Sequence, residues 1–393
     1  MLGRDTVVGV VGAGAMGSGI AQVAAGAGHR VVLADADSAA VMRARDGLTK
    51  TLAREVEKGR LPVGEDAAVR SRITFVDGVN DLGAFAACGL VIEAIVERLD
   101  MKRALFAALE SVVGADAVLA TNTSSLPIAA IGGGCRRAER VLGVHFFNPA
   151  PVMPLVEIVP SLATAPDVAT ATRALVDAWK KTTVLASDTP GFIVNRVARP
   201  FYGEAIRMYE EGIADIATID WAMKTVGGFR MGPFELMDFI GHDVNFVVTR
   251  SVFEGMSFDP RYRPSVTQQR LVDAGWLGRK TGRGFYDYSS GGSTPTPMQD
   301  GLLAKLIFDR TIAMLVNEAV DAVLMRVASP RDVDLAMTKG VNYPKGLIAW
   351  GEEIGLATIL DRLEVMHTEY GEDRYRPSAL LRRLVREGRS LLA

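Results

Sequence analysis

The chain has 393 residues, of which 49% are hydrophobic and 23% are charged, and its formal net charge is −2. This balance is typical of an ordinary globular protein, and no basic stripe predicts a nucleic-acid or membrane partner. The only two cysteines, Cys88 and Cys135, argue against a disulfide framework and a structural zinc site. We therefore expect two or three domains, no metal and a cytoplasmic location.

The first motif lies at residues 7–35, where a buried strand, a glycine-rich turn, a helix and a second strand follow one another. The turn reads G-x-G-x-x-G: its first glycine makes the tight turn, the second lets a pyrophosphate approach the backbone, and the third lets the helix pack closely. The helix N-terminus offers free N–H groups to the phosphates. Asp35, at the end of the second strand, can accept from both ribose hydroxyls and would repel a 2′-phosphate, which predicts NAD rather than NADP. The expected cofactor contacts of this motif are Gly12, Gly14, Ala15, Met16, Gly17 and Asp35.

Alternating strands and helices continue to residue 187. We expect helices at 38–58 and 167–181, and strands at 72–76, 90–95, 117–120, 141–147, 155–159 and 183–186. This alternation predicts a doubly wound, Rossmann-like α/β domain over residues 1–187. Ligands bind at the carboxyl ends of the strands in such sheets, and Asn122, Ser124 and His145 lie at or just beyond expected strand ends.

His145 is the candidate general base. An NAD-dependent reaction needs a group that takes the proton of the hydride donor, and histidine can do so near neutral pH. Glu157 lies on the next strand, after a proline-rich turn. If the two strands are neighbours, Glu157 can accept from His145 and hold its tautomer. We expect His29 to be a surface turn residue, and His242 and His367 to be structural or solvated.

The remainder of the chain shows helical periodicity and repeats itself. A helix is expected to begin at Pro190 and Gly191, and the segment 203–241 aligns with 317–355 at a constant spacing. An identical R-Y-R-P-S sequence also recurs, beginning at Arg261 and at Arg374. The expected divisions are an NAD-binding domain at 1–187, a helical domain at 188–288, a linker at 289–299 and a second, shortened helical copy at 300–393.

These motifs together resemble the L-3-hydroxyacyl-CoA dehydrogenases, including bacterial 3-hydroxybutyryl-CoA dehydrogenases and the dehydrogenase part of multifunctional fatty-acid oxidation proteins. The resemblance extends over residues 7–288 and implies oxidation of an (S)-3-hydroxyacyl-CoA to 3-oxoacyl-CoA by NAD. The matching stretches are 12–22, 121–126, 145–149, 155–157, 188–196, 231–236 and 280–285.

The resemblance also implies residue roles. His145 would be the base paired with Glu157, while Ser124 and Asn195 would position the substrate, supported by Asn148. Further residues would lie around the nicotinamide half or contact coenzyme A. Glu97, Lys102, Asn122 and Lys280 form the first group; Lys50 and Lys58 form the second, and Lys102 could also reach the coenzyme A phosphates.

The second helical copy departs from the short members of the family. It carries Asp309 where the first copy has Asn195 and has no counterpart of residues 282–286. It could occupy, from within one chain, the surface that forms the dimer interface in short members. We therefore expect a monomer held by an internal pseudo-dimer, with a homodimer as the alternative.

Two other functions remain open at this point. One is a dehydrogenase of a small hydroxy acid that is not a coenzyme A ester. The other is a non-catalytic NAD-binding protein similar to certain lens crystallins. Short, long and dicarboxyl acyl chains are all compatible with the sequence.

Overall fold

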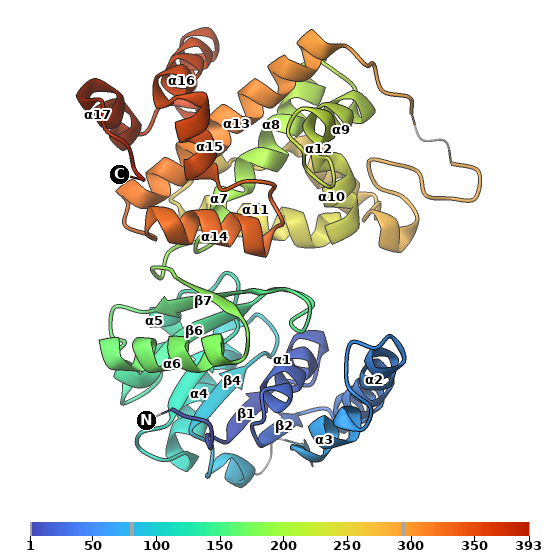
Figure 1. The fold of residues 1–393 in the computed structure, drawn as a ribbon, viewed down its shortest axis with the longest axis vertical. Helices are drawn as coiled ribbons and strands as arrows, with labels where there is room; N and C mark the ends of the chain where they lie inside the picture. The colour runs from blue at the N-terminus through green and yellow to red at the C-terminus, as the bar shows by residue number, and fades with distance from the viewer. Residues whose placement is uncertain (1, 79–81, 293–294, 393) are drawn as a thin grey trace. The chain divides into compact units, whose positions relative to one another are not determined.

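The computed structural model describes residues 2–78, 82–292 and 295–392, and its chain divides into two compact units between Thr189 and Pro190. Residues 293 and 294 of the expected linker lie outside the described residues, as do residue 1 of the expected NAD-binding domain and residue 393 of the expected second helical copy. The first unit is built on a sheet and the second is helical (Figure 1). The predicted fold class is therefore confirmed.

The first unit contains one eight-stranded sheet in the order β3-β2-β1-β4-β5-β6-β7-β8. All neighbouring strands run parallel except β6 and β7, which are antiparallel. The order reverses from β1, so the glycine-rich turn after β1 lies at the position where doubly wound sheets bind ligands. The strands are β1 (Val8–Val11), β2 (Val31–Asp35), β3 (Ile73–Asp77), β4 (Leu90–Glu93), β5 (Val118–Thr121), β6 (Val141–Phe146), β7 (Leu155–Pro160) and β8 (Thr182–Leu185).

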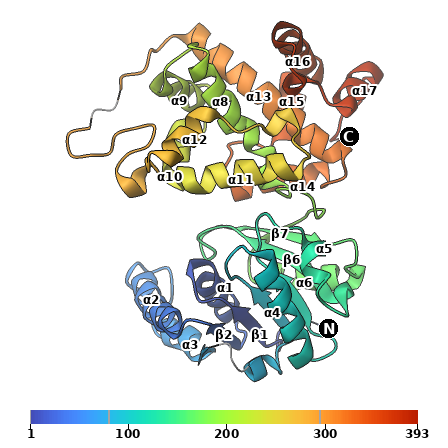
Figure 2. The same cartoon turned by 180° about the vertical axis from the view of Figure 1, so that it is seen from behind.

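Helices cover both faces of this sheet. The helices α1, α2 and α6 contribute side chains to a core on one face, while α4 and α5 lie on the other (Figures 1 and 2). Because both faces are covered, the central strands are buried along their whole length and consist mostly of apolar residues. The helices of this unit are α1 (Ala15–Gly26), α2 (Ser38–Glu57), α3 (Glu65–Ser71), α4 (Leu99–Val112), α5 (Ile128–Gly132) and α6 (Pro166–Ala178), with short 3₁₀ turns at Leu82–Phe85 and Ala138–Arg140.

The regular elements in the described residues of the second unit are helices, joined by turns and by a non-helical stretch before α13 that includes two isolated bridges at Arg283. The expectation that a helix begins at Pro190 is wrong. Gly191 and Phe192 have positive φ angles of 77° and 48°, so they form a left-handed turn, and the helix begins only after it. The helices are α7 (Val194–Val197), α8 (Arg199–Glu210), α9 (Ile216–Thr225), α10 (Pro233–Ile240), α11 (His242–Gly255), α12 (Val266–Asp273), α13 (Gly301–Leu324), α14 (Pro330–Gly340), α15 (Leu347–Ile354), α16 (Leu356–Tyr370) and α17 (Ala379–Glu387), with 3₁₀ turns η3 (Pro260–Tyr262), η4 (Arg279–Thr281) and η5 (Asp373–Tyr375).

The helices α9 to α12 and their intervening turns recur in order as α14 to α17. One capping contact repeats with them. The carboxylate of Asp220 accepts from the first backbone N–H groups of α10, at 2.9 Å each, and the carboxylate of Asp334 accepts from those of α15, at 2.7 and 3.0 Å. Both side chains thus satisfy backbone N–H groups that a helix N-terminus leaves without intrahelical partners, while burial raises the pKa of Asp334 and raises that of Asp220 to about 7.

The helix α13 crosses the second unit and packs against helices of both copies (Figure 1). Residues 310–320 are buried on every side of the helix, including the charged residues Arg310 and Glu318. Buried charges require partners, and these two find them in the other copy. Within the described ranges, no helix combines the length and the apolar character needed to span a membrane.

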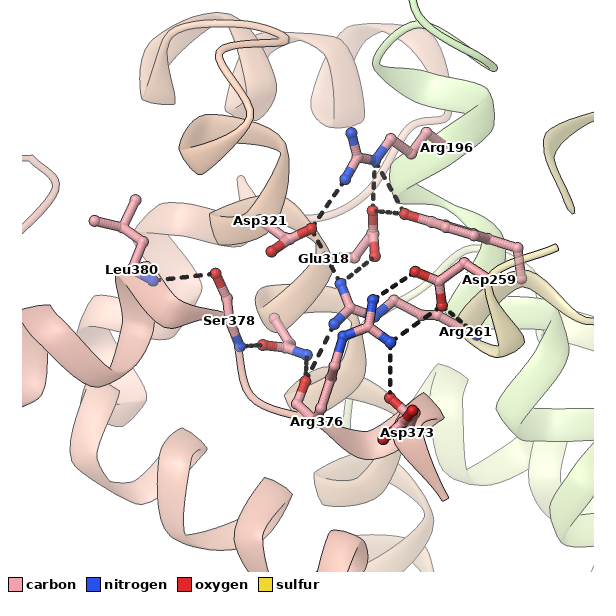
Figure 3. Close-up of polar contacts among 11 residues, drawn as sticks. Arg196, Asp259, Arg261, Glu318, Asp321, Asp373, Arg376, Ser378 and Leu380 are labelled. Atoms are coloured by element: carbon pink, nitrogen blue, oxygen red, sulfur yellow. Dashed lines mark hydrogen bonds and ion pairs between the residues drawn. The ribbon is translucent and has the colours of Figure 1, made fainter. Parts of the chain in front are cut away.

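The two copies exchange equivalent ion pairs. The Glu318 cluster joins Glu318 of the second copy to Arg196, Arg261 and Tyr262 of the first (Figure 3). The Glu204 cluster joins Glu204 of the first copy to Arg310, Arg374 and Tyr375 of the second. Each residue of one cluster is the aligned counterpart of a residue of the other, so the contact is reciprocal, as in a two-fold symmetric interface.

Candidate active site

The central pair of the candidate site lies on β6 and β7. Because these strands run antiparallel, His145 lies directly opposite Glu157, and its Nδ1 is 2.6 Å from Oε2 of the glutamate. Glu157 is fully buried, and His145 is 5% exposed. With Nδ1 donating to the carboxylate, Nε2 is the basic nitrogen of the ring. The expected adjacency of the two strands is therefore correct.

The turn that carries Ser124 follows β5 and is held by Glu97. The Glu97 Oε1 atom accepts from the hydroxyls of Thr123 (2.5 Å) and Ser125 (2.9 Å) and from the backbone N–H of Ser124 (3.2 Å). Burial acts to raise the pKa of Glu97, but the Lys102 ammonium and the two hydroxyls outweigh it, and the pKa lies below its ordinary value. Glu97 is therefore ionised at neutral pH and fixes the backbone at Ser124.

Lys102 lies behind this turn and is 1% exposed. Its Nζ is 2.6 Å from Oε1 of Glu93 and 3.2 Å from Oε2 of Glu97. Glu93 also accepts from the hydroxyl of Thr121 at 2.7 Å. Buried in this way, Lys102 has no surface with which to reach the coenzyme A phosphates, contrary to that part of the expectation. It connects the end of β4 to the turn that carries Ser124.

Two asparagines lie close to the central pair in the chain. The Oδ1 atom of Asn122 accepts from the backbone N–H of Phe146 at 2.8 Å, which ties the end of β5 to the strand of His145. Asn148 is exposed in the turn that follows β6. The structure thus brings Asn122, Ser124 and His145 to one edge of the sheet, as predicted from their strand-end positions.

The glycine-rich turn has the shape that a bound pyrophosphate requires. A Cβ atom on Gly12 would lie 2.4 Å from the carbonyl oxygen of Ala94, and one on Gly17 would lie 1.7 Å from that of Gly12. A Cβ on Gly14, in contrast, would meet nothing within 4 Å. Gly14 is also the N-cap of α1 and makes no side-chain cap bond. The turn is therefore closed at Gly12 and Gly17 and open at Gly14, just before Ala15 and Met16 begin the helix, which fits an anion at that N-terminus.

Asp35 ends β2 beside this turn. Its Oδ2 atom accepts from the backbone N–H of Ala13 at 2.6 Å, and its Oδ1 atom accepts from that of Asp37 at 2.9 Å. A carboxylate has about four lone-pair sites, so these bonds leave capacity for ribose hydroxyls. Asp35 is therefore suited to join the phosphate turn to the ribose of a dinucleotide.

Asn195 and Lys280 belong to the second compact unit. Asn195 lies in the single turn of α7, and Lys280 lies in η4. The Lys280 ammonium is 2.5 and 2.6 Å from the two carboxylate oxygens of Asp243, near the start of α11. This ion pair holds the side chain of Lys280 at the surface of its own unit.

Lys50 and Lys58, the expected coenzyme A contacts, lie on α2 and directly after it. Both are exposed, as is Arg54 between them. Among the described residues, neither lysine forms an ion pair within 4 Å.

Sequence reasoning missed the residues that hold the predicted ones in place. Thr121, Thr123 and Ser125 are small hydroxyl residues beside Ser124, and the density of hydroxyls in that run was the available signal. No local signal could identify Asp243, because it lies 37 residues before Lys280. Its role depends on how the helices pack.

The chain matches two family profiles in succession. The NAD-binding domain of 3-hydroxyacyl-CoA dehydrogenase matches residues 7–189. The C-terminal domain of 3-hydroxyacyl-CoA dehydrogenase matches residues 191–288 and again 306–391. The chain belongs to the 3-hydroxyacyl-CoA dehydrogenase family. It is accordingly an oxidoreductase that uses NAD and acts on 3-hydroxyacyl-CoA.

Matches to relatives in the 3-hydroxyacyl-CoA dehydrogenase family cover either nearly the whole of this chain or about 71% of it. The 3-hydroxyadipyl-CoA dehydrogenase of Escherichia coli K12 is 40% identical, and the match covers 97% of this chain and 98% of that protein. Human mitochondrial hydroxyacyl-coenzyme A dehydrogenase is 39% identical over 71% of this chain and 90% of its own length. A crystal structure of 3-hydroxybutyryl-CoA dehydrogenase from E. coli K12 has a TM-score of 0.93 at 39% identity, covering 98% of this chain and 100% of that one.

Proposed function

We propose that this dehydrogenase oxidises the C3 hydroxyl of short (S)-3-hydroxyacyl-CoA esters, with His145 as the general base and Glu157 as the residue that orients it. The observation that supports this assignment is the buried, 2.6 Å contact between the two side chains at the carboxyl edge of the sheet. A buried carboxylate opposite a strand-end histidine is otherwise costly, since both groups must lose water.

In the proposed reaction, Nε2 of His145 takes the proton of the C3 hydroxyl as the C3–H bond breaks. NAD, when bound, accepts the hydride from C3. Glu157 keeps the ring in the tautomer with its proton on Nδ1 and stabilises the imidazolium that forms. The products are 3-oxoacyl-CoA, NADH and one proton, which His145 releases to water.

The remaining site residues act by binding and orientation. Ser124 and Asn195 would position the substrate oxygen and thioester, and Asn148 would support them. The nicotinamide half would lie among Glu97, Asn122 and Lys280, with the buried Lys102 acting only through Glu97. Lys50 and Lys58, exposed on and after α2, would bind the coenzyme A phosphates.

Two further properties belong to the proposal. The first is the acyl chain that this enzyme accepts. Because one relative is named 3-hydroxyadipyl-CoA dehydrogenase, we propose that this enzyme accepts acyl chains of about that length, including chains that end in a carboxylate. We also propose a cytoplasmic monomer, because both cysteines are free thiols and the two copies satisfy each other's buried charges within one chain.

The testing experiment follows NADH absorbance with acetoacetyl-CoA, 3-oxoadipyl-CoA or free acetoacetate as oxidant. Turnover with the thioesters but not with acetoacetate is expected, and the ratio of kcat/KM between the two thioesters would report the chain preference. Turnover with free acetoacetate at a similar rate would favour a dehydrogenase of free hydroxy acids instead. Tight NADH binding without turnover of any of the three would favour a non-catalytic protein.

A further inference from the structure

Arg196, the residue after Asn195, forms ion pairs with the second helical copy. The Nε atom of Arg196 is 2.6 Å from Oε1 of Glu318, and its Nη2 is 3.1 Å from Oδ2 of Asp321 (Figure 3). Both acids lie on α13, whereas Arg196 lies on α7. Arg196 is 1% exposed and Glu318 is fully buried. This charge-assisted contact is therefore shielded from solvent and has a defined geometry.

The backbone around Asn195 lies between a left-handed turn and a longer helix. The helix α7 has only four residues, and Ala198 alone separates it from α8. It follows the left-handed turn of Gly191 and Phe192, a conformation that non-glycine residues rarely adopt. The backbone N–H of Arg196 closes that turn by donating to the carbonyl of Gly191 at 3.2 Å. Outside contacts must hold this segment, and the side chain of Arg196 supplies one.

Other residues fix Glu318 in the orientation that meets Arg196. The hydroxyl of Tyr262 donates to Oε1 of Glu318 at 2.6 Å, and Nη1 of Arg261 lies 3.3 Å from Oε2. Arg261 Nη1 also lies 3.2 Å from Asp321. Both carboxylate oxygens of Glu318 are thus bound to groups of the first copy.

The Glu204 cluster provides the same chemistry without a site residue beside it. Arg310 Nε is 2.9 Å from Oε2 of Glu204, and the hydroxyl of Tyr375 donates to the same oxygen at 3.1 Å. Asp309 precedes Arg310 where Asn195 precedes Arg196, and it pairs with Lys305 within the long helix α13. Of the two equivalent clusters, only the Glu318 cluster adjoins a residue with a proposed substrate role.

We infer that Glu318 is a positioning residue for Asn195, so that the second helical copy sets the geometry of substrate binding through Arg196. The inference rests on the proposed role of Asn195. It assigns the duplicated part of the chain a function in catalysis besides stability. A displacement of about 1 Å in a substrate-positioning group can lower a rate about 100-fold.

The test compares Glu318→Gln with Glu204→Gln in the full chain, using acetoacetyl-CoA and NADH. Each substitution removes one buried charge from equivalent clusters, so both are expected to lower Tm by similar amounts. We expect Glu318→Gln to lower kcat/KM for the thioester by about 10- to 100-fold with the Kd for NADH unchanged. Glu204→Gln is expected to stay within about threefold of the original enzyme.

A double-mutant cycle separates positioning from general destabilisation. If Glu318 acts through Asn195, Glu318→Gln should add little in an Asn195→Ala background. Equal kcat/KM for the two glutamine variants, or full additivity in the cycle, would overturn the inference. Should Glu318→Gln fail to fold, Arg196→Lys tests the same contact, because it keeps the charge but loses the fork that reaches both Glu318 and Asp321. Lack of thioester turnover by the unmodified enzyme would instead refute the proposed function.

Discussion

At the scale of single residues, His29, His242 and His145 differ in the partners that their rings contact. The ring of His29 is buried and its Nδ1 lies 2.9 Å from the carbonyl of Thr6, so the expectation of a surface turn residue is wrong. His242 is fully buried beside Asp238 in the helical unit, which agrees with a structural role. Only His145 pairs with a buried carboxylate at the carboxyl edge of the sheet.

Replacing His145 with glutamine should therefore remove the base and leave the cofactor turn intact. We expect kcat for acetoacetyl-CoA reduction to fall by about 10²- to 10⁴-fold, the usual contribution of general acid–base catalysis, with little change in the Kd for NADH. Stopped-flow turnover and NADH fluorescence titration measure the two quantities. The matched control is His29→Gln, which alters a buried histidine away from the site and should change Tm more than kcat. Retention of most activity by His145→Gln would exclude His145 as the base.

Asp35 provides a second test at this scale. Asp35→Asn keeps an acceptor for the backbone of Ala13 but removes the carboxylate that would accept from the ribose hydroxyls of a bound cofactor. Loss of a charge-assisted hydrogen bond of about 1.5–3 kcal/mol should raise the KM for NADH about 10- to 100-fold and reduce discrimination against NADPH. Asp37→Asn is the control, because Asp37 is exposed and caps α2. An unchanged NADH to NADPH ratio in Asp35→Asn would contradict the assigned role.

At the scale of elements, the junction of β4 with α4 supports the turn that carries Ser124. Lys102 neutralises Glu93, which is fully buried, and also reaches the half-exposed Glu97. The three groups form a small network in which each charge depends on the others. Its integrity determines where Ser124 lies.

Lys102→Met should lower the free energy of unfolding at neutral pH by about 3–5 kcal/mol, because it leaves a buried carboxylate without its cation. The folded pKa of Glu97 is lowered, so its stabilising contribution is present above its ordinary pKa of 4.5 and is lost as the pH falls through the lowered value. Urea denaturation from pH 7 to pH 3 should therefore show the variant and the original enzyme converging as the pH falls below about 4.5. The double variant Glu93→Gln/Lys102→Met should recover part of the loss. A pH-independent difference would contradict this account.

Much of the element order follows from hydrophobic periodicity, and the errors have local physical causes. The strands were predictable because both faces of the sheet are covered, which makes each strand an apolar run bounded by turns. The helix expected at Pro190 failed because the left-handed turn at Gly191 and Phe192 depends on packing against α11, where a Cβ on Gly191 would lie 2.8 Å from Val252. Asp37 caps α2 by accepting from the backbone N–H of Ala39, and the neighbouring Ser38 is a residue of equally good capping type, so sequence alone does not decide between them.

In the candidate site, contacts between residues close in sequence were predictable, and contacts between distant residues were not. The pair of His145 and Glu157 was predictable because a short proline-rich connection favours adjacent strands. The burial of Lys102 was not predictable from the sequence. Lys102 lies on α4, and its burial depends on contacts with Glu93 at the end of β4 and with Glu97 in the loop that follows. Long-range partners such as Asp243 for Lys280 leave no periodic pattern in the sequence.

At the scale of the whole molecule, the Glu318 and Glu204 clusters make the two copies complete each other. Removing either copy would leave buried arginines of the other without anions. The match to human mitochondrial hydroxyacyl-coenzyme A dehydrogenase covers 71% of this chain and 90% of that protein. The internal pairing therefore predicts that no second chain is needed.

We expect light scattering after size-exclusion chromatography to give the mass of one chain, 42.1 kDa, over a wide range of loading concentrations. The same measurement at high salt should be unchanged, because the pairing charges are buried and weakly screened. A stable mass of twice this value would favour a homodimer and contradict the internal pseudo-dimer as the reason for a monomeric state.

The reciprocal clusters also change how assembly responds to dilution. Two separate subunits held by these contacts would dissociate once their concentration fell below the Kd. Here Arg196 and Glu318, 122 residues apart, belong to one polymer, so the partner is always present at an effective concentration of about the millimolar range. A cell that makes only a few copies of this enzyme would thus still hold each of them fully assembled.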